Sequence, residues 1–334
     1  MSCTVGIIAN PSAGKDIRRL VSEATVVTAP EKVALLRRAL VGIGAAGVDR
    51  VLYLRDAMQL VDQALQGVSP VRRPRIAAEP LQLALHRTPE DTSRAAREMR
   101  DAGASALLVL GGDGTSRLVA TEIGDLPMLA LSTGTNNAFP QWADATAAGL
   151  ALGVVARGFA PEALSRRKRL AVEYDDQGPQ WALVDAVVLG ASYHGTQAVW
   201  TADDVEQIVA SQATPGTVGW SAVIAADSPL AVEEPFGAHA VCSPRARRRV
   251  VAAIGPGLIE EVGLVSMERL TLGEAVAVGP GPKTIALDGE PLVRLAAGKR
   301  AAIRVLSDGP VVVDIASALR SAAARGVFVR ERCH

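Results

Sequence analysis

Residues 107–115 read LLVLGGDGT, an apolar run that passes directly into three glycines, one aspartate and one threonine. The apolar run predicts a buried strand, and the residues from 115 onward have the spacing of a short helix. A glycine turn between a strand and a helix lets backbone N–H groups approach a phosphate closely, and the helix N-terminus favours negative charge. The turn therefore indicates an open α/β sheet with a ligand at the carboxyl ends of its strands.

Asp113 is the one carboxylate in this turn, and burying it without a partner would be costly. If it faces phosphates, it can contact a divalent cation or accept a proton from a substrate hydroxyl. The alternative is a tight turn in which Asp113 only caps the following helix.

Strand and helix patterns alternate through the first 155 residues. Thr88 and Pro89 form a helix start, with Thr88 as the N-cap and Pro89 at the first helical position. Alternation of this kind predicts a parallel sheet covered by helices. We expect strands at 4–9, 48–54, 106–110 and 128–131, and helical spacing at 17–21, 31–40, 89–102 and 115–121.

The rhythm changes from about Arg169 to Val305, where short β-rich runs alternate with turns, and residues 315–324 look helical again. We therefore expect an α/β fold in three parts. An α/β/α nucleotide-binding domain with a parallel sheet covers residues 1–155, a mainly β substrate domain covers 156–306, and a segment at 307–334 returns to the first domain.

Composition excludes several classes of function. The chain has 35 Lys and Arg against 35 Asp and Glu, so no global charge points to nucleic acid or an anionic membrane. No apolar run is long enough to cross a bilayer and no secretory signal is visible, so we expect a cytoplasmic protein without a membrane partner. Three scattered cysteines and four scattered histidines match no disulfide framework or zinc spacing.

Other glycine-rich and basic stretches are alternative candidates for a phosphate-binding site. Residues 42–47 spell GxGxxG, but helix-like sequence precedes them and a strand follows, so we interpret them as a helix end. The Gly14-Lys15 pair lacks the first glycine and the Ser or Thr of a P-loop. Two basic clusters, at 166–169 and 245–249, are either a solvated rim or a phosphate-facing patch.

A second strand and glycine loop follows, in which residues 128–131 lead into a loop that contains Gly134. GGDGT followed by a GTxN loop resembles the superfamily that joins NAD kinases to diacylglycerol and sphingosine kinases. The opening 10–15, NPSAGK, is similar to the NPxSG start of the lipid-kinase branch. Within the superfamily, the chain most resembles the AcoX group, the NAD-kinase-like proteins associated with acetoin catabolism.

The resemblance implies ATP as phosphoryl donor, Mg²⁺ as cofactor, NAD as the acceptor substrate, and a homo-oligomer, either a dimer or a tetramer. It also implies a role for Asp113 in phosphoryl transfer. The nucleotide-binding residues that it implies are Asn10, Gly111, Gly112, Gly114 and Thr115 from the first two loops, and Thr133, Gly134, Thr135, Asn136 and Asn137 from the second glycine loop.

The chain departs from both branches in its second half. NAD kinases carry an A-L-N-E stretch that grips the dinucleotide, and its counterpart here ends in Val184-Asp185. Asp185 can accept ribose hydroxyl bonds as the Glu does, whereas Val184 offers no hydrogen bond. In the T-P-T-G-S-T-A-Y-S stretch, Trp220 takes the place of the Tyr, either against the ligand or as a core residue. Glu290 of Asp288-Gly289-Glu290 matches lipid kinases, where NAD kinases show DGQ, and Ala138 stands where lipid kinases have an Asp.

The leading hypothesis is an ATP-dependent kinase that phosphorylates a ribose hydroxyl of NAD or a related nucleotide. Asp113 would be the base or a metal-side ligand, Asp288 a metal ligand, and Asp185 and Trp220 contacts of the acceptor. Glu290 would assist from the side opposite Asp113. Two alternatives stay open: a lipid or small-alcohol kinase with Glu290 as base, and a nucleotide-binding regulator that has lost efficient catalysis.

Overall fold

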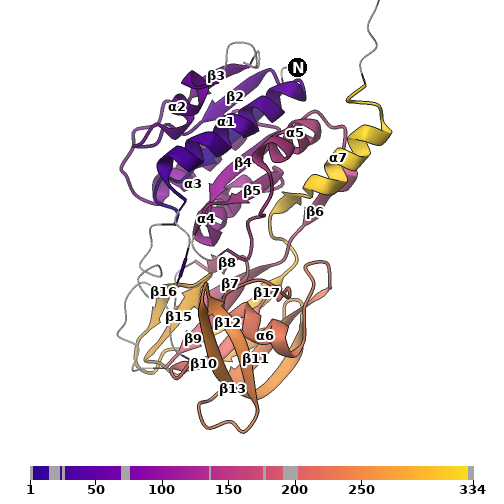
Figure 1. The fold of residues 1–334 in the computed structure, drawn as a ribbon. Coiled ribbons are helices and arrows are strands. Elements are labelled where there is room, and N and C mark those ends of the chain that lie inside the picture. The colour runs from indigo at the N-terminus through magenta and orange to yellow at the C-terminus, as the bar shows by residue number, and fades with distance from the viewer. Residues whose placement is uncertain are drawn as a thin grey trace, which may run out of the picture.

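The computed structural model describes residues 3–14, 23–24, 27–68, 76–134, 137–175, 178–190 and 202–329. They form two lobes, an upper one of helices around a sheet and a lower one built almost entirely from strands (Figure 1). The predicted helical spacing at 17–21 lies outside the described residues. The predicted fold class, an α/β lobe with a parallel sheet followed by a mainly β lobe, is confirmed.

The first lobe contains a seven-stranded sheet in the order β3-β2-β1-β4-β5-β18-β6. Every pairing is parallel except that of β6 with β18. Its strands are β1 (Thr4–Ala9), β2 (Arg50–Tyr53), β3 (Ala77–Pro80), β4 (Ala106–Gly111), β5 (Met128–Ser132), β6 (Leu164–Arg166) and β18 (Val311–Val313). Its helices are α1 (Ala29–Ala45), α2 (Leu60–Gln66), α3 (Glu90–Asp101), α4 (Asp113–Ile123), α5 (Ala145–Ala156) and α7 (Ile315–Ala324), with a 3₁₀ turn η2 (Pro161–Ala163).

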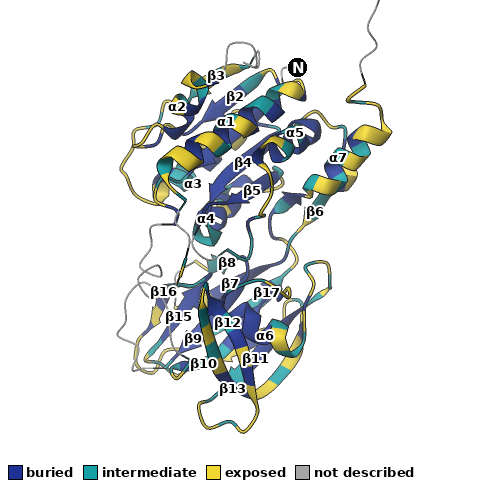
Figure 2. Ribbon diagram, viewed as in Figure 1, coloured by how far each residue is buried: buried dark blue, intermediate teal, exposed yellow. Residues whose placement is uncertain are grey.

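Helices cover both faces of this sheet, which explains the unbroken apolar run before GGDGT. Leu108 and Leu110 of β4 pack in one core with α1, α2, α5 and α7. Leu107 and Val109, which point to the other face, pack in a second core with α3 and α4. A strand buried on both faces has no polar alternation, as Figure 2 shows for the centre of the sheet.

The GxGxxG stretch is a helix end, as predicted, because α1 runs to Ala45 and Gly47 takes a left-handed φ of 83°. Its glycines serve helix packing. A Cβ on Gly42 would collide with the backbone of α5 at Thr146, and a Cβ on Gly149 would collide with Ala39. The two helices therefore cross with their backbones in contact.

The start of α3 differs from the prediction by one residue. The helix begins at Glu90 with Pro89 as its N-cap, and the hydroxyl of Thr88 does not cap it. Instead the carboxylate of Asp91 turns back and accepts hydrogen bonds from the N–H groups of His86 and Arg87. Arg87 takes a left-handed φ of 61°, so the chain turns sharply before the helix.

The second lobe is a pair of antiparallel sheets with a core between them. The larger sheet has the order β12-β13-β11-β10-β9-β15-β16 and the smaller β14-β17-β7-β8. The elements are β7 (Arg169–Tyr174), β8 (Gln180–Ala182), β9 (Asp185–Leu189), β10 (Val205–Ala210), α6 (Ser221–Asp227), β11 (Phe236–Cys242), β12 (Arg249–Gly255), β13 (Leu258–Thr271), β14 (Ala275–Val278), β15 (Lys283–Leu287), β16 (Glu290–Leu295) and β17 (Ala301–Leu306).

Two crossings connect the lobes, one from β6 to β7 and one from β17 back to β18 (Figure 1). The basic cluster at 166–169 lies on the first crossing. Arg169 forms a bidentate ion pair with Asp308 of the second crossing, with N–O distances of 2.7 and 2.8 Å. The buried Lys168 donates to the carbonyls of Ala231, Glu234 and Phe236. The Arg169 pair joins the two crossings, and Lys168 fixes the first crossing to the segment that leads into β11. Within the described ranges, no helix is long and apolar enough to span a membrane.

Candidate nucleotide site

The predicted site residues gather where the strand order of the first sheet reverses. From β1 the chain proceeds outward to β2 and β3, and from β4 it proceeds the other way to β5. Ligands of open α/β sheets bind at such a point, outside the carboxyl ends of the strands. Here the ends of β1 and β4 lie side by side, so Asn10 and the GGDGT turn are neighbours.

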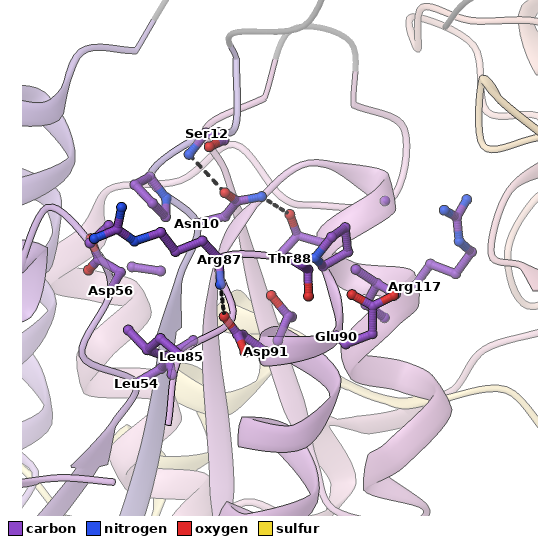
Figure 3. Close-up of a pocket in the computed structure, with 18 of the residues that line it drawn as sticks. Asn10, Ser12, Leu54, Asp56, Leu85, Arg87, Thr88, Glu90, Asp91 and Arg117 are labelled. Atoms are coloured by element: carbon purple, nitrogen blue, oxygen red, sulfur yellow. Dashed lines mark hydrogen bonds between the residues drawn. The ribbon is translucent and has the colours of Figure 1, made fainter. Parts of the chain in front are cut away.

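Asn10 joins the first loop to the GGDGT turn. Its amide nitrogen donates to the hydroxyl of Thr115 at 2.8 Å, and its side-chain oxygen accepts from the N–H of Ser12 at 2.8 Å. Figure 3 shows both bonds at one wall of a cavity. The side chain of Asn10 thereby fixes both the loop after β1 and the start of α4.

The GGDGT turn and the second glycine loop are in direct contact. The N–H of Thr133 donates to the carbonyl of Gly111 at 3.1 Å. A Cβ on Gly112 would lie 2.9 Å from the side-chain oxygen of Asn137, and a Cβ on Gly134 would meet the same side chain. The glycines thus let the two loops close on each other. Thr135 and Asn136 lie outside the described residues.

Asp113 is the first residue of α4 and ties the two loops together. Its carboxylate accepts hydrogen bonds from the N–H groups of Ala138 and Phe139 at 2.9 to 3.2 Å. The half-buried side chain also lines a narrow cavity of about 30 Å³, which it shares with Asp185 and Trp220. The carboxylate is therefore held at the junction of both loops, on the side that faces the second lobe.

Lys32 is a site residue that sequence reasoning missed. Only 1% of it is exposed, and its ammonium group donates to the carbonyls of Asn10, Pro11 and Ala13 at 2.8 to 3.1 Å. These three hydrogen bonds therefore fix the backbone conformation of the NPSAG loop. The signal was present in the sequence, because Lys32 lies four residues before Leu36 on the apolar face of α1.

Arg117 is the second residue missed, and it links the lobes. From α4 its guanidinium donates a hydrogen bond to the carbonyl of Leu287 at 2.8 Å. It also forms ion pairs with the carboxylates of Glu290 at 2.6 Å and Asp288 at 3.6 Å. The Glu290 carboxylate also lies against the GGDGT turn, because a Cβ on Gly114 would come within 2.5 Å of it. Glu290 is thus close to the predicted phosphate cradle, and a guanidinium holds it there.

Asp288 is buried and is engaged with the backbone. Its carboxylate accepts from the N–H groups of Leu183 and Val184 at 2.8 to 3.1 Å, and the N–H of Asp185 is 3.4 Å away. Burial raises the pKa of this carboxyl, while Arg117 and the backbone donors oppose the shift. These contacts fold the β8–β9 junction. The role of Asp288 as a metal ligand stays a prediction.

Asp185 and Trp220 lie on the far side of the narrow cavity. The carboxylate of Asp185 accepts from the N–H of Ser221 at 3.0 Å, at the start of α6. Trp220 is only 4% exposed and packs into the core of the second lobe, yet it also lines this cavity. Val184 is buried against the α3 and α4 side of the first lobe, where an apolar side chain fits.

A wide cavity of about 610 Å³ lies on the other side of the GGDGT turn (Figure 3). The predicted residues therefore divide between two cavities that share this turn. Asn10, Gly114, Thr115 and Glu290 line the wide cavity, and Asp113, Asp185, Trp220 and Asp288 line the narrow one. The segment before α3 closes the wide cavity with Arg87, Thr88 and Glu90.

The carboxylates fit Mg²⁺ only as an ion that arrives with phosphates. Among the described residues, no group of three or more His, Cys, Asp or Glu side chains could hold a metal. Mg²⁺ commonly binds through one or two carboxylates plus substrate phosphates, and it does not require a protein cage. Asp113, at the junction of the two glycine loops, is the carboxylate best situated for that arrangement.

Two family models together match most of the chain. The model for the N-terminal domain of ATP-NAD kinases matches residues 5–159. The model for the C-terminal domain of acetoin catabolism protein X matches residues 168–308. Acetoin catabolism protein X of Cupriavidus necator is 33% identical over 329 residues, covering 95% of this chain and 92% of that protein.

Two solved structures were found to resemble this chain in fold. The crystal structure of yeast NADH kinase complexed with NADH aligns with a TM-score of 0.56 at 16% identity, covering 100% of this chain and 90% of that one. An NAD kinase from Archaeoglobus fulgidus in complex with ATP gives a TM-score of 0.48 at 12% identity, covering 98% of this chain and 100% of that one.

The first lobe thus matches the N-terminal domain of ATP-NAD kinases, and the chain as a whole has a fold similar to that of an NADH kinase. More narrowly, the chain belongs to the acetoin catabolism protein X family. The resemblance drawn from GGDGT and the second glycine loop is thereby confirmed.

Proposed function

We propose that this protein is an ATP-dependent kinase that transfers the terminal phosphoryl group to a hydroxyl of NAD or a related nucleotide. The observation that supports this most is the meeting of the two glycine loops on Asp113, with a cavity on each side. A phosphoryl donor and an acceptor can then approach the GGDGT turn from its two sides.

In this proposal the wide cavity receives the nucleotide donor and the narrow cavity receives the acceptor hydroxyl. Thr115 and Asn10 border the donor side with polar groups that the fold already fixes. Asp185 borders the acceptor side with a carboxylate that can accept a ribose hydroxyl bond. Asp113 lies between them and takes the proton of the acceptor hydroxyl. Positioning and charge neutralisation account for most of the catalysis in phosphoryl transfer.

Mg²⁺, when bound, would neutralise phosphate charge during transfer. Asp113 would contribute a carboxylate oxygen to the ion, and the remaining ligands would come from the phosphates and water. Lys32 keeps the NPSAG loop in shape, and Arg117 keeps Glu290 beside Gly114. We assign these two residues to positioning.

A second candidate function is a nucleotide-binding regulator without efficient turnover. Two observations favour it. Val184 is apolar where NAD kinases have an Asn, and the carboxylates of Asp113 and Asp288 already accept backbone hydrogen bonds. A carboxylate whose oxygens already accept backbone hydrogen bonds has fewer lone pairs left for a substrate proton or a cation.

The test is to incubate the purified full-length protein with Mg-ATP and one acceptor at a time, and to follow ADP release. The acceptors are NAD, NADH, diacylglycerol and sphingosine. The proposal predicts ADP release that requires NAD or NADH. Release that requires a lipid would replace it with the lipid-kinase alternative, and tight ATP binding without turnover on any acceptor would support the regulator.

A further inference from the structure

Arg87 differs from the other arginine that lines the wide cavity. Arg117 is 6% exposed and paired with Glu290 and the carbonyl of Leu287. The guanidinium of Arg87 is exposed and has no hydrogen-bond or ion-pair partner among the residues that the structure describes. In Figure 3 its side chain extends along the cavity wall toward the side where Asp56 lies.

The backbone at Arg87 is strained. Its φ of 61° lies in the left-handed region, which costs a residue with a side chain about 1 kcal/mol or more. Asp91 holds the turn in place by accepting from the N–H groups of His86 and Arg87 at 2.7 to 3.0 Å. Burial opposes ionisation of Asp91, yet these donors keep its pKa below the ordinary value. The turn is therefore fixed before any ligand binds.

The acidic groups of this cavity are already engaged. Asp56 accepts from the N–H groups of Met58 and Leu60, and Glu290 pairs with Arg117. Asp91 serves the turn, and Thr88 donates a hydrogen bond to Glu90. Among the residues that the structure describes, an anion that enters the cavity next to Thr115 thus finds one cationic side chain available, that of Arg87.

We propose that Arg87 binds the phosphate groups of the nucleoside triphosphate in the wide cavity, with its planar guanidinium forming paired hydrogen bonds to phosphate oxygens. This rests on the proposed function in assigning the cavity to a nucleotide. The turn held by Asp91 sets where this side chain leaves the backbone, so the loop itself need not be ordered on binding.

The test is to measure the dissociation constants of Mg-ATP and of magnesium tripolyphosphate by calorimetry for the full-length protein and its variants. Arg87→Gly removes the guanidinium and suits the left-handed backbone, so its melting temperature should be equal to or above that of the parent. Arg87→Asn, which also tolerates this conformation, is the second variant. Arg320→Ala removes one exposed positive charge on α7, on the other face of the sheet, and is the matched control.

We expect Arg87→Gly and Arg87→Asn to weaken ATP binding about 10- to 100-fold, as loss of a charge-assisted contact does, and Arg320→Ala to leave it within about twofold. Unchanged ATP affinity in both Arg87 variants overturns the inference while leaving the proposed function intact. If the parent binds tripolyphosphate through Arg87 but does not bind ATP, Arg87 is a polyphosphate contact, and both the nucleoside triphosphate named in the inference and the proposed function are overturned. No binding of either compound to the parent overturns both.

Discussion

Asp113 holds two loops together and is also the proposed proton acceptor, so its structural and chemical roles have to be separated by substitution. Asparagine keeps one side-chain oxygen that can still accept from Ala138 or Phe139. It removes the negative charge and the basic oxygen. Conservative replacement at this residue therefore tests chemistry with little change in the fold.

For Asp113→Asn we predict a rate loss of about 10²- to 10⁴-fold on the acceptor that proves correct, the range expected when a general base is removed. The melting temperature should stay unchanged, because the fold keeps an acceptor at this point. Steady-state kinetics and thermal unfolding of the purified variant measure the two effects. Turnover near that of the parent would show that another group takes the proton.

Glu290 is the residue at which the two kinase branches differ. Its carboxylate pairs with Arg117 at 2.6 Å and lies against Gly114, so it is held in place beside the cradle. For Glu290→Gln we predict a change in turnover within about tenfold, because Asp113 carries the proton chemistry. A loss in the range for a general base, about 10²- to 10⁴-fold, would assign that role to Glu290.

At the scale of single elements, α5 shows how local chemistry sets a helix start. Asp144 is its N-cap and accepts from the N–H groups of Thr146 and Ala147 at 2.8 and 3.3 Å. The hydroxyl of Thr146 and then these N–H groups lower the pKa of Asp144. A lowered carboxyl pKa means that the stabilisation is complete at neutral pH and disappears as the pH falls through that lowered value.

We therefore predict that Asp144→Ala lowers the free energy of unfolding by about 1 kcal/mol at neutral pH, the usual effect of losing an N-cap. The difference from the parent should shrink in acid, once both proteins lack the carboxylate. Urea unfolding at several pH values measures it. The control Asp125→Ala removes an exposed carboxylate that caps no helix, and a loss of the same size there would refute the capping explanation.

Elements with strong local signals could be predicted from the sequence, and pairings across long chain separations could not. The strand Thr4–Ala9 and the helix Ile315–Ala324 have the predicted bounds, because continuous apolar residues and helical spacing are local properties. The helix at Asp113 begins two residues earlier than expected, which puts the carboxylate itself in the first turn.

The site was only partly predictable for the same reason. The glycine loops and Asp113 are visible as motifs, whereas Arg117 meets Glu290 across 173 positions of chain. No pattern in the residues near Arg117 predicts that Glu290 is its partner. Lys32 could have been predicted, because it is a lysine on the apolar face of a helix. The left-handed backbone conformation of Arg87 could not, because it depends on the hydrogen bond that the N–H of Arg87 donates to the carboxylate of Asp91.

At the scale of the whole molecule, Arg117 links the two lobes in addition to the two crossings, the packing of Val184 against the first lobe and the hydrogen bond from Gln212 to the carbonyl of Ala138. Its side chain is 7% exposed and that of Asp288 is fully buried. Removing the cation would leave the Asp288 charge without its partner in a place where water cannot replace it. The link therefore stabilises the arrangement that puts the β lobe beside the glycine loops.

We predict that Arg117→Met lowers the free energy of unfolding by about 3 kcal/mol, as breaking one side of a buried ion pair does. Arg97→Met is the control, because Arg97 pairs with Glu122 on the exposed surface and should contribute less than about 1 kcal/mol. Urea unfolding of both variants makes the comparison. Equal losses in the two variants would mean that Arg117 does not link the lobes energetically.

Phosphoryl transfer to a nucleotide hydroxyl can be observed directly. The protein is incubated with Mg²⁺, NAD and ATP that carries ¹⁸O in its terminal phosphate. The products are then separated, and their masses are measured by mass spectrometry. We predict a labelled phosphate on NAD with the parent protein and almost none with Asp113→Asn. Label that appears only in inorganic phosphate, or remains in ATP that the protein binds tightly, would contradict the assignment of a nucleotide kinase.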